Sequence, residues 1–385
     1  MCSRSLKVME VYFDHAASTP TRPEVIEAML PWLADHPGNP SGAHREAREA
    51  RRVLDDARDA VAALVGADPG NVIFTSGGTE SDNLAIDGIL RSALGVAICP
   101  AAEHPAVLEP IRESNGVVAA TDEMGRLDLS VFTETLQSLE DVTLVSAMTA
   151  NNETGVINDI YAISEIVASH AAGALLHTDA VQAVAWLDLV EACRGADLVS
   201  LTGHKFGGPK GAGALVLCTE MVLMPVIRGG GQERERRGGT QNVAAIAGLG
   251  EAARLVMIER EETVKRVCQL RDRLEVGLIE RLPETVCTVS AGVPRTPGIT
   301  HLCWKGIESE ALIFLLEQEG IFASAASSCA SGAQEPSHVL AAMGVDREVA
   351  RGSLRLSLGH TTTEADVERA LTVIPIAVNQ LQGLN

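Results

Sequence analysis

The chain has 385 residues, of which 46% are hydrophobic and 21% charged, so it can bury a substantial core and is not a disordered polyelectrolyte. Aromatic residues make up only 3%, so we expect that core to consist mainly of Ala, Val, Leu and Ile. The formal net charge of −20 argues against binding to nucleic acid or anionic membranes, because both attract clusters of Lys and Arg.

Helical and strand patterns alternate along the first part of the chain. Residues 43–66 carry apolar positions at helical spacing and end at Gly66. We expect short apolar strands at 71–76, 96–100, 117–121, 143–148, 173–180, 196–205 and 214–218. Helical patterns lie between them at 80–93, from about 105, at 129–139 and at 159–172. This alternation predicts an α/β fold with a mostly parallel sheet that helices cover on both faces.

The pattern changes after a long helical region from about Asn242 to Leu282. Strands are expected at 298–304 and 352–359, and helices at 308–319 and 364–380. We therefore predict a large domain over 11–260 and a smaller α+β domain over 261–385, to which the N-terminal segment also contributes.

The cysteines point to a reducing compartment. None of the eight forms a C-x-x-C pair or a Cys/His spacing typical of zinc, so we expect free thiols and no metal site. The N-terminus lacks a hydrophobic signal core, and no apolar run is long enough to span a membrane. We therefore expect a cytoplasmic protein.

Cys329 stands in a different setting from the cysteines of the apolar strands. It lies in ASAASSCASGAQEPSHVL, a small-residue segment without periodicity, which is typical of a mobile loop. A thiol that is not buried in a core is a candidate nucleophile.

Polar residues follow the expected strands at the edge where parallel sheets bind ligands. Gly77, Gly78 and Thr79 open a helix whose backbone N–H groups favour a phosphate, although an ordinary strand-to-helix turn has the same pattern. Asp179 and Lys205 end two further strands, and a helix cap is the alternative for Asp179. A phosphate cradle, a Schiff-base lysine and an Asp partner for a ring nitrogen are what pyridoxal phosphate requires.

Two more side chains suit such a site. His104 follows the strand 96–100 and can stack on a ring or move protons, although a lone histidine is more often capped or exposed. Arg355 lies among apolar residues on an expected strand and needs a carboxylate, which an amino-acid substrate supplies.

Eight motifs now stand in order along the chain: FTSGGTESDNLAI, EHPAV, ANNETGVI, HTDAVQA, GHKFGGPKGAGAL, GGGQERERRGGTQN, EPSHVLAAMG and SLRLSLG. Together they resemble the cysteine desulfurases of the iron–sulfur assembly type, from about residue 11 to 375. These are fold-type-I pyridoxal-phosphate enzymes related to the class V aminotransferases.

The resemblance implies a role for each matching residue. Lys205 would form the Schiff base, Asp179 would pair with the pyridine nitrogen, and Cys329 would carry a persulfide. His104 would lie on the ring face and Gln182 would contact the ring oxygen. The phosphate would be bound by Gly78, Thr79, Thr202 and His204, and in a homodimer Thr240 would reach the phosphate of the partner subunit. Asn151 and Arg355 would contact the substrate, with Asn151 also near the cofactor.

The implied reaction converts L-cysteine to L-alanine and passes sulfur to an acceptor protein, such as an iron–sulfur scaffold, or into thiolation. The chain departs from the family pattern in having Thr202 for a usual serine, Gln241 for a frequent Glu, and SAASSC before the loop thiol. The alternatives are another pyridoxal-phosphate enzyme of this fold, either an aminotransferase or a selenocysteine lyase, and a non-catalytic sulfur carrier.

Overall fold

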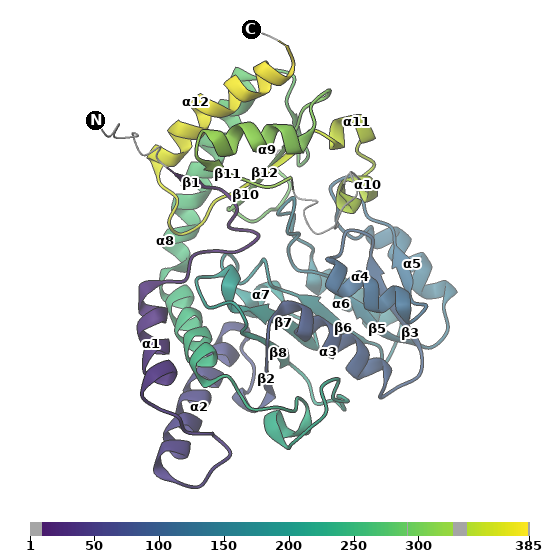
Figure 1. Cartoon of the computed structure of the whole chain (residues 1–385). Helices are drawn as coiled ribbons and strands as arrows, with labels where there is room; N and C mark the ends of the chain where they lie inside the picture. Colours follow the sequence, from purple (N-terminus) through teal and green to yellow (C-terminus); the bar gives the residue numbers. More distant parts are fainter. Residues whose placement is uncertain (1–9, 291, 326–336, 384–385) are drawn as a thin grey trace, which may run out of the picture.

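A central sheet organises most of the chain in the computed structural model, which describes residues 10–290, 292–325 and 337–383 (Figure 1). Its strands in spatial order are β2 (Val72–Thr75), β8 (Gly213–Leu217), β7 (Leu198–Thr202), β6 (Leu175–Asp179), β5 (Val142–Ser146), β3 (Val96–Pro100) and β4 (Val117–Ala119). β8 is antiparallel to both of its neighbours, and the other pairs are parallel. The prediction of a mostly parallel sheet is therefore confirmed.

Helices cover both faces of this sheet because consecutive strand residues point to opposite sides. Ile73 packs against α3 (Gly78–Leu90) and α4 (Pro105–Glu113), whereas its neighbour Phe74 belongs to the cluster on the opposite face. That second face is covered by α2 (Arg45–Val65), α5 (Leu129–Ser138), α6 (Ile160–His170), α7 (Leu189–Ala192) and the first half of α8 (Val243–Arg281), along which α1 (Pro23–Ala34) packs.

A second hydrophobic cluster, here called the C-terminal core, joins both ends of the chain. Val11 and Phe13 pack in it with residues such as Trp304 and Leu354. Its strands are β9 (Val286–Cys287), β10 (Ile299–Cys303) and β12 (Ser353–Ser357) in an antiparallel sheet, together with the parallel pair β1 (Val11–Tyr12) and β11 (Ile321–Phe322). Its helices are α9 (Ser309–Gln318) and α12 (Glu364–Leu381), with the short α10 (His338–Ala342) and α11 (Arg347–Ala350) nearby.

The helix α8 belongs to both cores. Its 39 residues follow the cap Asn242, whose side chain accepts a hydrogen bond from the Ala245 N–H. The first half is rich in Ala and Gly, because it packs closely on α2: a Cβ at Gly250 would lie 2.6 Å from Cα of Ala57. The second half contributes Leu and Val side chains to the C-terminal core. No helix formed by the described residues is long and apolar enough to cross a membrane.

Candidate active site

A pocket of about 320 Å³ opens where the ends of the sheet strands meet β12 and the N-terminal segment. Its lining contains most of the residues singled out from the sequence: Gly78, Thr79, His104, Asp179, Gln182, Thr202, His204, Lys205 and Arg355. It also contains Asp14, Asp82, Asn152 and Ser324, to which the sequence reasoning assigned no role. Ligand sites of open α/β sheets lie at this edge.

The first turn of α3 forms the floor at one end of the pocket. The helix begins after Gly77, which has a φ of 157° and provides no side-chain cap, so the first N–H groups have no capping side chain. Gly78 has no room for a side chain, since a Cβ there would lie 2.9 Å from Cγ2 of Val181. Open N–H groups and the helix dipole favour an anion here, with Thr79 and Thr202 beside them.

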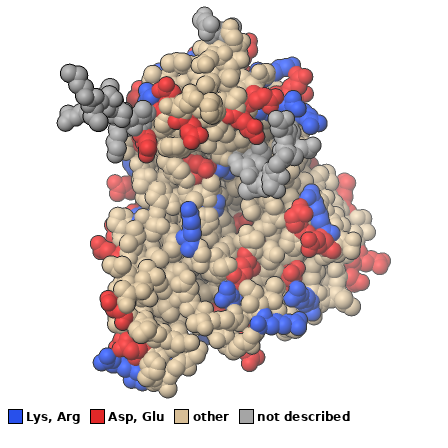
Figure 2. Space-filling view, viewed as in Figure 1, with Lys and Arg blue, Asp and Glu red and all other residues tan. Residues whose placement is uncertain are grey.

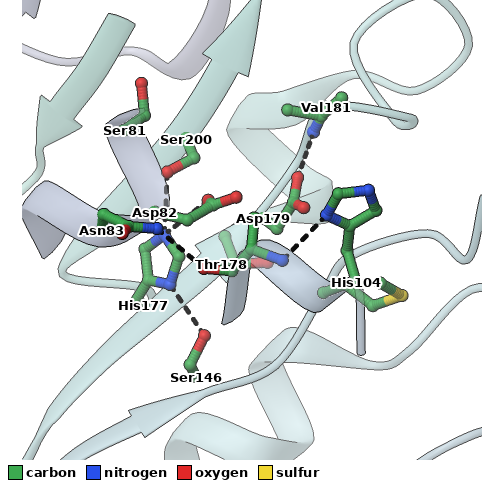
Figure 3. A network of polar contacts seen from close by, with 12 residues as sticks. Ser81, Asp82, Asn83, His104, Ser146, His177, Thr178, Asp179, Val181 and Ser200 are labelled. Carbon is green, nitrogen blue, oxygen red and sulfur yellow. Dashed lines mark hydrogen bonds and ion pairs between the residues drawn. The ribbon is translucent and has the colours of Figure 1, made fainter. Parts of the chain in front are cut away.

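Asp179 is the last residue of β6 and lines the pocket, and Figure 3 shows its contact with Val181. Its Oδ1 accepts a hydrogen bond of 2.8 Å from the Val181 N–H. Burial raises the pKa of this carboxyl, while the Val181 N–H and the charge of Lys205 lower it. A buried carboxylate in this position is stabilised by a cationic N–H partner in the pocket.

Lys205 ends the short 3₁₀ helix η2 (Gly203–Lys205), which directly follows β7. Its Nζ donates hydrogen bonds to the backbone carbonyls of Ala16, at 2.5 Å, and Ala17, at 3.0 Å. The N-terminal segment thus holds the amine at the pocket wall. Gln182 donates from Nε2 to the same Ala16 carbonyl at 2.8 Å.

His104 lines the pocket and caps a helix at the same time. Its Nδ1 accepts a hydrogen bond of 3.1 Å from the Ala106 N–H, which begins α4. Burial lowers the pKa of His104 to about 4, with further lowering from Lys205 and His338. The imidazole is therefore neutral near pH 7, and its ring remains in the pocket lining.

Arg355 enters from β12 and is held by the segment after β5 and by the N-terminal segment. Nη1 donates to the Asn152 carbonyl at 2.9 Å and Nη2 donates to Asp14 Oδ1 at 2.8 Å. Its Nε is buried and has no hydrogen-bond partner among the residues that the structure describes. A bound carboxylate is the kind of acceptor that this donor lacks.

Two of the predicted site residues that the structure describes do not line the pocket, and a third predicted residue is not described. Asn151 does not line the pocket: its Nδ2 donates to the Ala102 carbonyl and its Oδ1 accepts from the Glu153 and Thr154 N–H groups. Thr240 is exposed and is not part of the lining. Cys329 lies outside the described residues.

The described residues on either side of the Cys329 segment are anchored beside this pocket. Ser324 lines it and exchanges backbone hydrogen bonds with Arg355, at 2.8 and 3.4 Å. On the other side, the Ser337 hydroxyl donates to Glu153 Oε2, and His338 Nε2 donates to the Glu103 carbonyl at 2.8 Å. Glu103 and Glu153 directly precede and follow the pocket residues His104 and Asn152.

These features fit pyridoxal phosphate. The uncapped turn at Gly77 and Gly78 accommodates a phosphate, the amine of Lys205 accommodates an aldehyde, and the buried carboxylate of Asp179 accommodates a protonated ring nitrogen. The unpartnered Arg355 Nε then suits the carboxylate of an amino acid bound beside it.

Comparison with known proteins agrees with this fit. Residues 11–370 match the family described as Aminotransferase class-V. An IscS-like cysteine desulfurase of Mycobacterium tuberculosis (strain ATCC 25618 / H37Rv) is 44% identical over 380 residues, covering 95% of this chain and 96% of that protein. The cysteine desulfurase IscS of Methanosarcina thermophila is 40% identical over 385 residues, covering 97% of this chain and 93% of that protein. The solved structure of a NifS-like protein has a TM-score of 0.88 at 33% identity, covering 97% of this chain and 100% of that chain.

Proposed function

The chain belongs to the class-V aminotransferase family as one of its pyridoxal-phosphate-dependent cysteine desulfurases, and on this premise we propose which residues perform the reaction. The observation that carries the proposal is the convergence in one pocket of an amine, a buried carboxylate, an uncapped helix N-terminus and an arginine with an unpartnered Nε. The same geometry would serve an aminotransferase or a selenocysteine lyase, but the matching relatives favour neither.

The residues around the ring set the charge of the pocket. Pyridoxal phosphate supplies an aldehyde that condenses with an amine and a pyridinium ring that accepts the electron pair left at Cα. Asp179 would hold the proton on the ring nitrogen, the first turn of α3 with Thr79, Thr202 and His204 would bind the phosphate, and His104 would lie against the ring; all of these residues line the pocket.

Substrate positioning falls to Arg355 and proton transfer to Lys205. Arg355 lines the pocket and is fixed through both Nη atoms by Asp14 and Asn152, and we assign to its guanidinium the carboxylate of L-cysteine. Lys205 would move protons at the substrate: it would remove the Cα proton, protonate Cβ once the Cβ–S bond has broken, and return a proton to Cα when alanine forms.

Sulfur leaves the substrate through the thiol of Cys329. We assign it the attack on the substrate sulfur: the S–S bond of a persulfide forms, the Cβ–S bond breaks, and its electron pair stays with the carbon. Support comes from the flanking residues, since Ser324 lines the pocket and Ser337 donates to Glu153, the neighbour of the pocket residue Asn152. The persulfide then delivers sulfur to an acceptor protein, such as an iron–sulfur scaffold, or into thiolation.

The working form in this proposal is a homodimer in the cytoplasm. Thr240 lies outside the pocket of its own subunit, as a residue that completes the phosphate site of a partner must. The exposed apolar residues Ile26, Leu30 and Leu33 on α1, here called the α1 surface, border a groove with Pro209 and are the contact that we assign to the second copy. Among the described residues the cysteines are free, which suits a reducing compartment.

Two substitutions test the chemical roles. Lys205→Ala should lose the visible absorbance of the lysine-bound cofactor and release no alanine from L-cysteine, because no other amine takes its place. Cys329→Ser should keep that absorbance but lose the added mass of one sulfur atom on the Cys329 peptide. Retained absorbance with alanine formation in the first variant would contradict the lysine assignment, and a full yield of sulfide from the second would contradict the thiol assignment.

A further inference from the structure

A group of buried polar side chains adjoins the pocket, which one of its members, Asp82, lines (Figure 3). His177 on β6 forms hydrogen bonds through Nδ1 to the Ser146 hydroxyl at 2.8 Å and through Nε2 to the Ser200 hydroxyl at 2.9 Å. Asp82, on the second turn of α3, lies beside this pair: its Oδ1 is 3.6 Å from His177 Nε2, and the Ser200 hydroxyl acts to lower its pKa. All four side chains are at most 1% exposed. We call Asp82, Ser200, His177 and Ser146 the buried relay.

The buried relay adjoins the carboxylate that faces the cofactor. Asp179 follows His177 by two residues on the same strand and pairs in register with Ser200, so these side chains share one face of the sheet. Asp82 and Asp179 both line the pocket, and Glu103 is a third buried carboxyl whose charge acts on Asp82. Three negative charges with so little exposure repel one another strongly unless cations match them.

The surroundings of the carboxyls decide which one stays ionised. Asp179 has the Val181 N–H and the charge of Lys205 to stabilise its anion. Asp82 has the Ser200 hydroxyl, but its Oδ1 has no hydrogen-bond partner among the described residues and lies 3.6 Å from His177 Nε2. Burial lowers the pKa of His177 to about 3, so this imidazole offers no positive charge, and burial followed by the charge of Asp179 raises the pKa of Asp82.

We propose that Asp82 is a positioning residue that keeps its proton, donates it in a hydrogen bond to Ser200, and thereby holds the negative charge on Asp179. Ser200 then donates to Nε2 of His177, and the Nδ1–H of His177 donates to Ser146. An ionised Asp82 would reverse every one of these bonds, because Ser200 would have to donate to it and Nε2–H to Ser200. The tautomer of His177 therefore reports the proton on Asp82.

The inference goes beyond the proposed function but rests on it in one point, the pairing of Asp179 with the ring nitrogen. The contacts that carry it are those of the protein alone. Its test can therefore be read separately from the reaction.

The first test measures the tautomer in the cofactor-loaded protein. Ring-¹⁵N-labelled histidine is observed by NMR near pH 7.5, and His177→Gln identifies the signals of His177 by their disappearance. We expect a protonated Nδ1 and an unprotonated Nε2. A protonated Nε2, alone or with Nδ1, would overturn the proposal.

The second test compares Asp82→Asn with Asp82→Ala. The amide of Asn donates to Ser200 as a carboxylic acid does, so Asp82→Asn should bind the cofactor within about threefold of the original affinity. Ala leaves Ser200 without this partner and should bind roughly tenfold more weakly. If Asp82 is ionised, removing its charge beside Asp179 changes the affinity and the pH at which the visible band titrates in Asp82→Asn itself, which would sink the inference.

Asp179→Asn separates the inference from the function it rests on. This variant should lose the affinity and the visible band of the bound cofactor. If it does not, the role proposed for Asp179 is wrong, whereas the NMR result for His177 still decides the protonation of Asp82.

Discussion

At the residue scale, a site residue could be found from the sequence when it lies at the end of a strand or within a few residues after it. Asp179 and Lys205 both do so, and the parallel arrangement of β6 and β7 brings them to one edge. Asp82 was missed because it lies inside a helix, where the side that it faces depends on how α3 packs on the sheet. Asp14 was missed because it comes from the other end of the chain, and only folding brings it to Arg355.

The buried histidine opposite Arg355 should make the stability of the fold depend on pH, and this effect can be tested at that one residue. His301 pairs in register with Arg355 on β10, and neither of its ring nitrogens has a hydrogen-bond partner among the described residues. Burial, together with Arg355, lowers the pKa of His301 to about 3. The unfolded chain therefore takes up a proton below its usual pKa of 6.5 while the folded protein does not, so stability falls as the pH drops from 6.5 towards 3.

Replacing His301 should remove that loss. The free energy of unfolding can be measured with urea and circular dichroism at about pH 7.5 and about pH 5.5. Between these two values it should fall by about 1.4 kcal/mol more in the original protein than in His301→Gln. His170→Gln removes an exposed histidine and is the matched control, which should keep the original pH dependence. Equal pH dependence in the original protein and His301→Gln would contradict the argument.

At the element scale, periodicity predicted the long elements and failed where exposed apolar residues or backbone strain decide the structure. The expected helices at 43–66 and 364–380 match α2 and α12 closely. We did not expect α1, whose sequence contains Pro23 and Pro31 and leaves apolar residues facing outward. The stretch 234–239 has the pattern of a solvated charge run, but the charge just before it, Glu233, is buried.

Glu233 anchors a turn in which three successive non-glycine residues have positive φ. Glu233, Arg234 and Glu235 have φ values of 47°, 57° and 67°, which cost on the order of 1 kcal/mol each. Glu233 offsets this cost by accepting hydrogen bonds from Arg58, at 2.9 and 3.1 Å, and from the Phe74 N–H at 3.0 Å. The turn leads to Thr240, so its shape sets where that residue is presented.

Removing this anchor should destabilise the protein strongly. Glu233→Ala leaves the Arg58 guanidinium without its carboxylate, and we expect the free energy of unfolding to fall by about 3 kcal/mol. Glu235→Ala changes an exposed carboxylate of the same turn and should stay within about 0.5 kcal/mol of the original. Chemical unfolding measures both, and equal effects of the two changes would refute the anchoring role.

At the scale of the whole molecule, acidic side chains are spread over the face seen in Figure 2, with basic ones among them. This agrees with the net charge of −20 and leaves α1 as a surface where apolar residues gather instead. The residue composition therefore predicts the overall charge, but only the fold shows which apolar side chains remain exposed. Leu30 and Leu33 are 58% and 68% exposed, although their spacing is that of a buried helix face.

Introducing negative charge on the α1 surface should dissociate the second copy that we propose to cover it. Leu30→Glu combined with Leu33→Glu should convert a dimer into monomers in sedimentation velocity, because two carboxylates would be buried opposite two others. Cofactor affinity should fall as well, since Thr240 of the partner would be withdrawn. Phe314→Glu on α9, where the side chain is 60% exposed, is the control and should remain dimeric. A double variant that stays dimeric would place the interface elsewhere.

The continuity of α8 constrains how the protein can move and come apart. Its 39 residues form an unbroken rod roughly 58 Å long, with one end embedded beside the central sheet and the other in the cluster that carries Arg355. A continuous helix that packs in both cores couples them and provides no hinge between them. A tilt of one half of the protein therefore strains the other half. The two halves should therefore melt as one cooperative unit, and a cut anywhere along the rod should cost both halves their shape.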